Sequence, residues 1–372
     1  MTLAAALALL FCVSAWAEDS ADAFEEAYGE FVGSLPRDVT DRMPDGLLSE
    51  DAESVGQAVA ETVDFGWLMG QIGEALSARM GEALSLAARL TALLALSALL
   101  SSVRGGLGSE AAGRAAELCS SAVMAGVLVS LTYDAVRVAV DFLDRLSVLV
   151  GAMVPMMGAL LASGGNVSTA VTAGGGMAVF LGIVEHLCAK TLPPVVGACV
   201  ALSVSGAVFG GANLRGVANL IKRVYTFFLG AVMLALTFSL SVQTSLSAGA
   251  DGLAMRSARM LAGRAIPVVG GSVGDTLRTV AGSVGYLKAT VGGVGLAALA
   301  LVLVPPLVYI VLYRLVLIAA HAAADLLGCT AEGKLLDAMV TVFGYILAVM
   351  CICAVTVIFL VTLFVKCGVA MG

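Results

Sequence analysis

Charged residues and histidines are scarce in this sequence. Asp, Glu, Lys and Arg together make up 13% of its 372 residues, whereas soluble domains contain roughly 25% of them. Its two histidines, His186 and His321, are too few to favour a zinc or haem centre built from this residue. The sequence also lacks an HExxH motif, a phosphate-binding P-loop and a serine or cysteine recognisably paired with histidine. We therefore predict no enzyme, no catalytic residue, no cofactor, no metal site and no nucleic-acid binding.

Hydrophobic residues take the place of the missing charges. They form 60% of the chain, and its mean hydropathy is +1.01, far above the range of soluble proteins. This composition is typical of an integral membrane protein. Because a helix crosses a bilayer with about 20 apolar residues, we predict an all-α fold, a polytopic membrane bundle of about eight spans.

The N-terminus predicts a secretory signal followed by an acidic segment. Residues 1–17 hold an apolar stretch too short to span a bilayer and end in the small-x-small pattern Ala15-Trp16-Ala17. The usual basic start is missing, so retention as a membrane anchor is the alternative. Residues 18–83 contain 16 acidic and 3 basic side chains, and we predict an extracytoplasmic, largely helical segment there. The membrane domain is predicted at 84–372.

The end of the acidic segment predicts an amphipathic helix that runs toward the first span. Apolar residues recur there at spacings of three and four, which places them on one helix face. This face fits either packing within a small exported domain or docking of a partner. Its residues are Phe65, Leu68, Met69, Ile72, Leu76 and Met80.

Charge-free apolar runs locate the candidate spans. The run 146–184 is too long for one ordinary helix, and the sequence SGGN (Ser163 to Asn166) predicts a turn at its midpoint. Residues 314–337 fit either a loop or a short extra membrane segment. The predicted spans are 83–103, 115–137, 146–163, 167–184, 191–214, 224–250, 289–313 and 338–365.

The basic residues do not support the orientation that eight spans require. With residue 18 outside, strict alternation leaves nine Lys or Arg outside and seven inside, contrary to the positive-inside rule. Five of the nine lie between Arg256 and Lys288. Either this Gly-rich region, 251–288, is re-entrant or interfacial, or one assigned hairpin is wrong.

Glycines recur at a helical spacing in and after this region. The sequences GSVG, GSVG and GGVG follow one another at steps of eleven and ten residues, close to three helical turns. A helix face without side chains allows another backbone to approach closely in lipid. The alternative is a flexible or broken helix, because glycine weakens helices. The predicted helix-packing face consists of Gly271, Gly274, Gly282, Gly285, Gly292 and Gly295.

Two charges accompany these glycines, Asp275 and Arg278. They stand three residues apart and can be neighbours on a helix. Ionisable residues inside a membrane usually face a protein interior or a water-filled path, so we predict functional charges; ordinary interfacial charges are the alternative.

Partial matches to the motifs of intramembrane aspartyl proteases make such a protease a remote alternative function. Tyr133-Asp134 is similar to the Tyr-Asp pair of those enzymes, and SVGD ending at Asp275 is similar to their Gly-x-Gly-Asp motif. Ser272 replaces the first glycine of that motif, and no clear Pro-Ala-Leu follows. Two short partial matches are weak support for a protease.

The stretch from Ser239 to Leu296 resembles the signature region of the stage III sporulation protein AE family of endospore-forming bacteria. The resemblance rests on SVQ at 241–243, Asp251-Gly252, IPVVGG at 266–271 and Lys288 before the Gly-rich span. PMMGALLASGG at 155–165 and the signal followed by an acidic segment are also similar. The missing basic start departs from the family pattern.

This resemblance implies a multi-pass subunit in the mother-cell membrane that surrounds the forespore. The family belongs to a transenvelope, secretion-like channel complex that links the two cells and supports late forespore gene expression. Implied partners are ring-forming proteins, a cytoplasmic ATPase and a forespore membrane protein, and a homo-oligomer is a further possibility. The alternative function is a stand-alone secondary transporter with Gly-rich broken helices.

Overall fold

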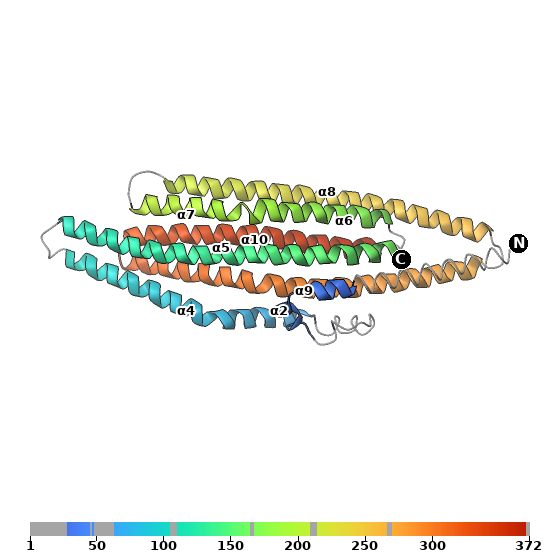
Figure 1. Ribbon diagram of the computed structural model, residues 1–372, viewed down its shortest axis with the longest axis horizontal. Coiled ribbons are helices and arrows are strands. Elements are labelled where there is room, and N and C mark those ends of the chain that lie inside the picture. Colours follow the sequence, from blue (N-terminus) through green and yellow to red (C-terminus); the bar gives the residue numbers. More distant parts are fainter. Residues whose placement is uncertain are drawn as a thin grey trace.

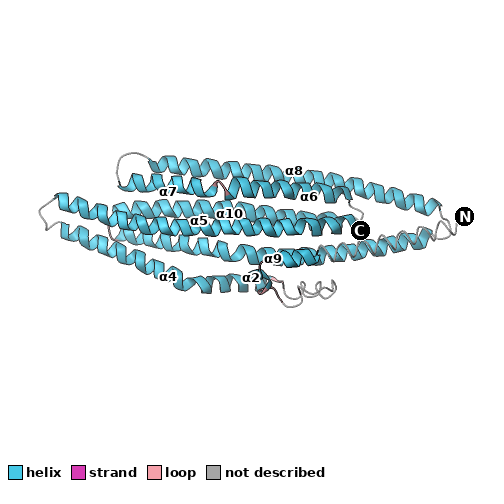
Figure 2. Cartoon of the chain, viewed as in Figure 1, coloured by secondary structure: helices cyan, strands magenta, loops and turns pink. Residues whose placement is uncertain are grey.

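The computed structural model describes residues 28–44, 47, 63–104, 110–163, 167–208, 214–265 and 270–369. Regular structure in these residues is all helical, which confirms the predicted fold class. The helices lie side by side in one elongated bundle (Figures 1 and 2). Their bounds are α2 (Arg37–Thr40), α4 (Phe65–Arg104), α5 (Glu110–Ser163), α6 (Val167–Ile183), a π-helical stretch (Val184–Ala189), α7 (Leu192–Val208), α8 (Leu214–Ala265), α9 (Gly270–Leu326) and α10 (Thr330–Val369).

Six segments of the described chain are long and apolar enough to cross a membrane, so the chain is a multi-pass membrane protein. They contain 34 to 42 residues, about 51 to 63 Å at 1.5 Å per residue. A bilayer core is only about 30 Å thick. The segments are Phe65–Leu100, Leu118–Ala159, Ser168–Gly206, Gly216–Leu253, Gly292–Leu326 and Thr330–Leu363.

Two of the eight predicted spans merge into α5, so the predicted connection between residues 137 and 146 is wrong. The intervening sequence VAVDFLDR contains no glycine or proline to end a helix. Asp141 also pairs with Arg145 one turn further on, at 2.8 Å, and such a pair supports a helix. The charges interrupt an apolar run without turning the chain.

The predicted spans 167–184 and 191–214 also follow one path. α6 passes into the π-helical stretch, and α7 continues in the same line after two turn residues (Figure 1). Pro193 and Pro194 lie in the first turn of α7, where proline removes no helical hydrogen bond. The count of about eight spans is therefore replaced by six long segments.

Two connections between helices bear on the predicted turns, one after α5 and one after α9. α5 ends at Ser163 and α6 begins at Val167, and the two helices pack antiparallel, with Gly151 near Leu181 and Gly174 near Val154. The chain therefore reverses direction between Ser163 and Val167, as the turn predicted at SGGN requires; residues 164–166 themselves lie outside the described residues. Residues 314–337 contain the end of α9 and the start of α10; Gly328 between them has φ +73°, which glycine adopts without strain at a helix end.

The Gly-rich region 251–288 forms the ends of two long helices. α8 runs through to Ala265, and α9 starts at Gly270. Figure 1 shows that these two ends extend beyond α5, α6 and α10. We call residues 254–265 and 270–291 the arm. Whether the arm is interfacial or re-entrant in the membrane stays a prediction.

The described N-terminal part packs on the bundle. Phe31, Val39 and Leu47 are buried, and the Tyr28 hydroxyl donates a hydrogen bond to the Leu47 carbonyl at 2.9 Å. Burial raises the pKa of Tyr28, so it remains a donor. The signal, residues 1–17, lies outside the described residues, and the boundary of the acidic segment stays a prediction.

The amphipathic helix predicted from Phe65 is confirmed as the first part of α4. Its apolar face is only partly covered by the described residues. Leu68, Ile72 and Leu76 are half-buried, whereas Phe65 is 74% exposed and Met69 43% exposed. This leaves apolar surface for lipid or a partner.

Candidate functional site

A belt of charged side chains crosses the bundle between two apolar halves. Its members on α5 extend from Asp134 to Arg145, about 17 Å along the bundle, and contacts between helices place the others within this range. Charges at this depth are costly in lipid and usually face protein or water. We define the charged belt as Arg79, Glu82, Asp134, Asp141, Arg145, Lys222, Arg223 and Arg314.

The first part of the belt joins α4, α5 and α9. Arg79 pairs with Glu82 at 2.9 Å, and its guanidinium lies 5.7 Å from the ring centre of Tyr309. The Tyr313 hydroxyl donates to Glu82 Oε2 at 3.3 Å. Asp134 of α5 acts electrostatically on both tyrosines. Side chains from three helices thus form one polar cluster.

A cavity of about 410 Å³ adjoins this cluster. It is lined by a double proline, Pro305 and Pro306, which lie inside α9. Proline has no N–H, so the carbonyls of Leu301 and Val302 lose their helical hydrogen-bond donors. Both of those residues line the cavity too, together with Arg42, Arg79, Asp141, Arg145 and Tyr309. The site therefore combines backbone acceptors with basic side chains.

The second part of the belt lies between α8, α9 and α10. Lys222, Arg223 and Arg314 line a groove of about 610 Å³. Arg314 follows Tyr313 directly in the sequence, which links this groove to the first cluster. The Arg314 guanidinium lies so close to α10 that a Cβ on Gly344 would meet it at 3.3 Å.

Five charge-free runs lie mainly on one side of the belt, whereas a sixth, 191–214, lies mainly on the other. The five are 146–163, 167–184, 224–250, 289–313 and 338–365. Gly295 of α9 approaches Met153 of α5, and Gly176 of α6 approaches Leu240 of α8, so the runs pack together. The run 146–163 has 18 residues, about 27 Å long. We call this part the uncharged half, and its thickness matches one bilayer core.

A buried carboxylate clamps three helices in the other half. Glu332, in the first turn of α10, is 2% exposed. Its Oε1 accepts hydrogen bonds from Ser97 of α4 at 2.7 Å and Ser120 of α5 at 2.8 Å. A buried charge is tolerated when it is hydrogen-bonded in this way. Among the described residues, no group of three or more His, Cys, Asp or Glu is placed to hold a metal ion.

The six predicted packing glycines all lie in α9, but at two levels. Gly292 and Gly295 are buried, and Gly295 faces Met153 of α5. From that contact α5 continues ten residues to Ser163, about 15 Å, whereas α9 extends about 38 Å back to Gly270. Gly271, Gly274, Gly282 and Gly285 therefore lie in the arm, at or beyond the level where α5 ends. Their packing role stays a prediction.

Asp275 and Arg278 also lie in the arm, and their side chains are outside the described part of the chain. The helix places Asp275 34 residues from Tyr309, about 51 Å along α9. Gly295 of α9 faces Met153 of α5, and Asp134 stands 19 residues before Met153 on the antiparallel α5, which places it close to the level of Tyr309. The two aspartates of the protease hypothesis are thus on different levels of the bundle, too far apart to share a substrate.

The apolar runs and motifs did not point to Lys222, Arg314 or Glu332. Each stands at the edge of an apolar run, and we assigned such charges to loops between spans. The available signal was the absence of turn residues around them: no glycine or proline occurs from residue 217 to 229 or from 307 to 327. A charge in an unbroken helical sequence indicates an interior site rather than a loop.

A known protein family matches most of this chain. The family model described as stage III sporulation protein AE matches residues 54–370. Stage III sporulation protein AE of Bacillus subtilis (strain 168) is 25% identical over 249 residues, which are 65% of this chain and 62% of that relative. The chain thus spans about three fifths of the curated relative's length. No solved structure matches. Because the family match covers all of α4 to α9 and α10 through Val369, the chain belongs to the stage III sporulation protein AE family.

Proposed function

We propose that this chain is the membrane-embedded subunit of a secretion-like transenvelope channel complex that links mother cell and forespore. The observation that carries the proposal is the family match over residues 54–370, which includes α4 to α10. The proposed location is the mother-cell membrane around the forespore. Proposed partners are ring-forming proteins, a cytoplasmic ATPase and a forespore membrane protein.

The surface of the bundle suits a subunit that contacts lipid and other proteins. Large apolar side chains are exposed along α4, where Phe65 and Leu84 are 74% and 65% exposed, and along α8, where Phe227 is 78% exposed. Exposed apolar surface of this kind marks membrane or protein contacts.

The uncharged half is proposed to cross the bilayer, with the charged belt at one membrane surface and the arm on the other side. The other half of the bundle contains Arg89, Lys334 and Asp337 in its helices, whereas the five runs of the uncharged half contain no Asp, Glu, Lys or Arg. The first part of α4, with Glu74, and the segment with Arg42 lie beside these runs. The arm carries five basic side chains against Asp275. Because Arg79 of the belt belongs to the segment 18–83 proposed to be extracytoplasmic, we place the belt outside and the arm in the cytoplasm.

Deletion and complementation test the function. Deleting the gene in its endospore-forming host is expected to stop late forespore gene expression after engulfment, and the wild-type gene should restore it. A matched control carries Arg137→Gln, an exposed position of α5, and should complement fully. Normal late expression in the deletion strain would contradict the proposal.

One observation supports a second candidate function, that of a stand-alone secondary transporter. Transporters bind solutes near unwound helices with free carbonyls, and Pro305 and Pro306, which leave two carbonyls of α9 without helical donors, line a cavity here. Solute uptake by the purified protein in liposomes, without any partner, would favour this function.

A further inference from the structure

The groove between α8, α9 and α10 holds basic charge that the described residues do not neutralise. Lys222 is 5% exposed and forms no ion pair with a described residue; Asp337 acts on it electrostatically, beyond salt-bridge distance. The Nε of Arg314 is buried without a hydrogen-bond partner in the described part of the chain. Arg223 adds a third, exposed cation.

Buried unpaired cations are costly, so this arrangement favours an anionic ligand. Desolvation disfavours a charged group unless an opposite charge or hydrogen bonds compensate for it. An arginine and a lysine in one groove provide the fork and the point charge that bind phosphate oxygens. Asn219 and Thr341 supply further polar side chains to the lining.

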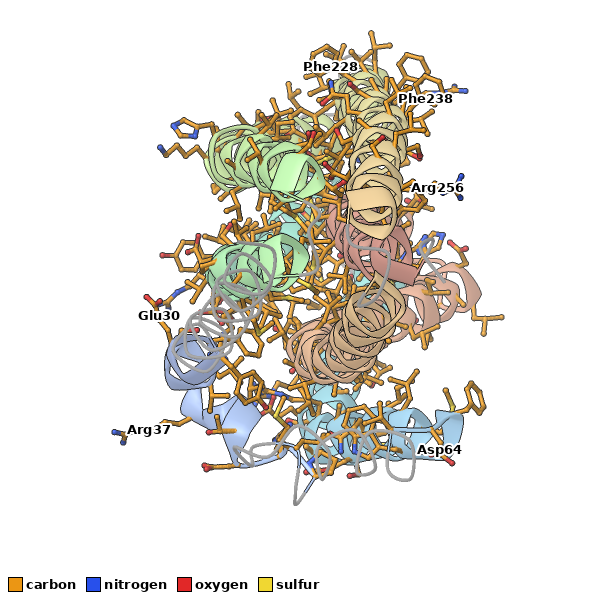
Figure 3. All side chains as sticks on the ribbon, turned by 90° about the vertical axis from the view of Figure 1, so that its right-hand side faces the viewer. Glu30, Arg37, Asp64, Phe228, Phe238 and Arg256 are labelled. Atoms are coloured by element: carbon orange, nitrogen blue, oxygen red, sulfur yellow. The ribbon has the colours of Figure 1, made fainter. Side chains whose placement is uncertain are left out.

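One edge of the groove leads onto exposed apolar surface. Phe227 lines the groove and is 78% exposed, followed along α8 by Leu234 and Phe238, both 70% exposed. Phe228 and Phe238 project outward from α8 (Figure 3). The charge-free run of α8 starts at Val224, directly after Lys222 and Arg223. Cations and exposed aromatic side chains thus adjoin at the limit of the uncharged half.

We propose that this groove binds an anionic phospholipid. Its phosphate is held by Lys222, Arg223 and Arg314, and its acyl chains lie along α8 over Phe227, Leu234 and Phe238. A zwitterionic lipid carries a choline or ethanolamine cation that these three cations repel, which gives the site its selectivity. The lipid compensates the buried charges and fastens α8 to α9 and α10.

Lipid retention by the purified full-length chain tests the proposal. The protein in mild detergent is mixed with phosphatidylglycerol or with phosphatidylcholine of the same acyl chains, and bound lipid is counted by native mass spectrometry. We expect retention of phosphatidylglycerol alone. Each of Lys222→Met, Arg223→Gln and Arg314→Gln should weaken it about tenfold, the effect of one lost charge-assisted contact. The control Arg137→Gln, an exposed cation outside the groove, should bind normally.

Three results would overturn the proposal. Equal retention of both lipids would show that the groove does not select an anionic lipid. Retention at the wild-type level by all three groove variants would show that the lipid binds elsewhere. Inorganic phosphate that displaces the lipid at equal concentration would show a site for soluble phosphate instead. Arg223 is exposed, so its variant folds even if the buried positions do not tolerate change, and it reports on the site by itself.

Discussion

Gly295 of α9 lies directly against Met153 of α5: a Cβ on Gly295 would come within 2.5 Å of Met153 Cε. Helices in lipid gain no hydrophobic benefit from association, so close packing through small residues contributes to holding them together, alongside hydrogen bonds between helices. Gly176 and Leu240 make the same kind of contact between α6 and α8.

Replacing Gly295 with leucine should therefore loosen the bundle. Alanine needs only a shift of the flexible methionine, but a leucine side chain has no space, and overpacking of this kind costs about 1–3 kcal/mol. We expect a lower thermal unfolding temperature in detergent for Gly295→Leu. Gly126→Leu is the matched control, since nothing lies within 4 Å of a Cβ there; equal effects of the two would contradict the packing account.

The arm glycines should matter for assembly rather than for folding of the bundle. Gly274→Leu combined with Gly285→Leu is expected to abolish assembly and sporulation, because these positions lie at or beyond the end of α5. Assembly is read from crosslinked complexes, and stability from the unfolding temperature of the isolated protein. If the double variant assembles and sporulates normally, the arm is not a packing element.

Glu332 should stabilise the junction of α4, α5 and α10. Glu332→Ala removes the acceptor of the Ser97 and Ser120 hydroxyls, and hydrogen bonds to a charged group are worth about 1.5–3 kcal/mol. We expect a lower unfolding temperature for this variant, with Glu332→Gln between it and wild type, because the amide keeps an acceptor oxygen. An alanine variant as stable as wild type would show that the clamp contributes nothing.

The proposed bilayer placement predicts which residues react from outside. In a cysteine-free background, Arg137→Cys near the belt should react with a membrane-impermeant maleimide on intact protoplasts. Ser257→Cys in the arm should react only after the membrane is permeabilised. Labelling of Ser257→Cys in intact protoplasts would show that the arm lies outside the cell and would contradict the proposed orientation.

The sequence was sufficient for the helical class, the SGGN turn and the helix from Phe65, because these depend on apolar periodicity and on glycine. The predicted number of spans assumed that charged residues lie in loops between helices. That assumption is wrong for Asp141 to Arg145, which lie inside α5. A helix that contains an i,i+4 ion pair and no breaker continues through charges when protein or water surrounds them. The order of apolar and charged residues in one sequence does not show whether protein, water or lipid surrounds a given charge.

The belt could not be predicted for a related reason. Glu82, Tyr313 and Asp134 are far apart in the sequence, and only the packing of α4, α5 and α9 brings them together. Lys222 and Arg314 approach the same groove from different helices. Sequence periodicity places a residue on a face of its helix, but the register between helices is set by contacts such as that of Gly295 with Met153.

A crosslinked pull-down of the tagged chain from membranes of sporulating cells, read by mass spectrometry, tests the proposed function most directly. We expect recovery of the ring-forming proteins and the cytoplasmic ATPase, and their loss in the Gly274→Leu, Gly285→Leu variant. Recovery of the chain alone, at a defined oligomeric size, would contradict a role in the transenvelope complex and favour an independent transporter.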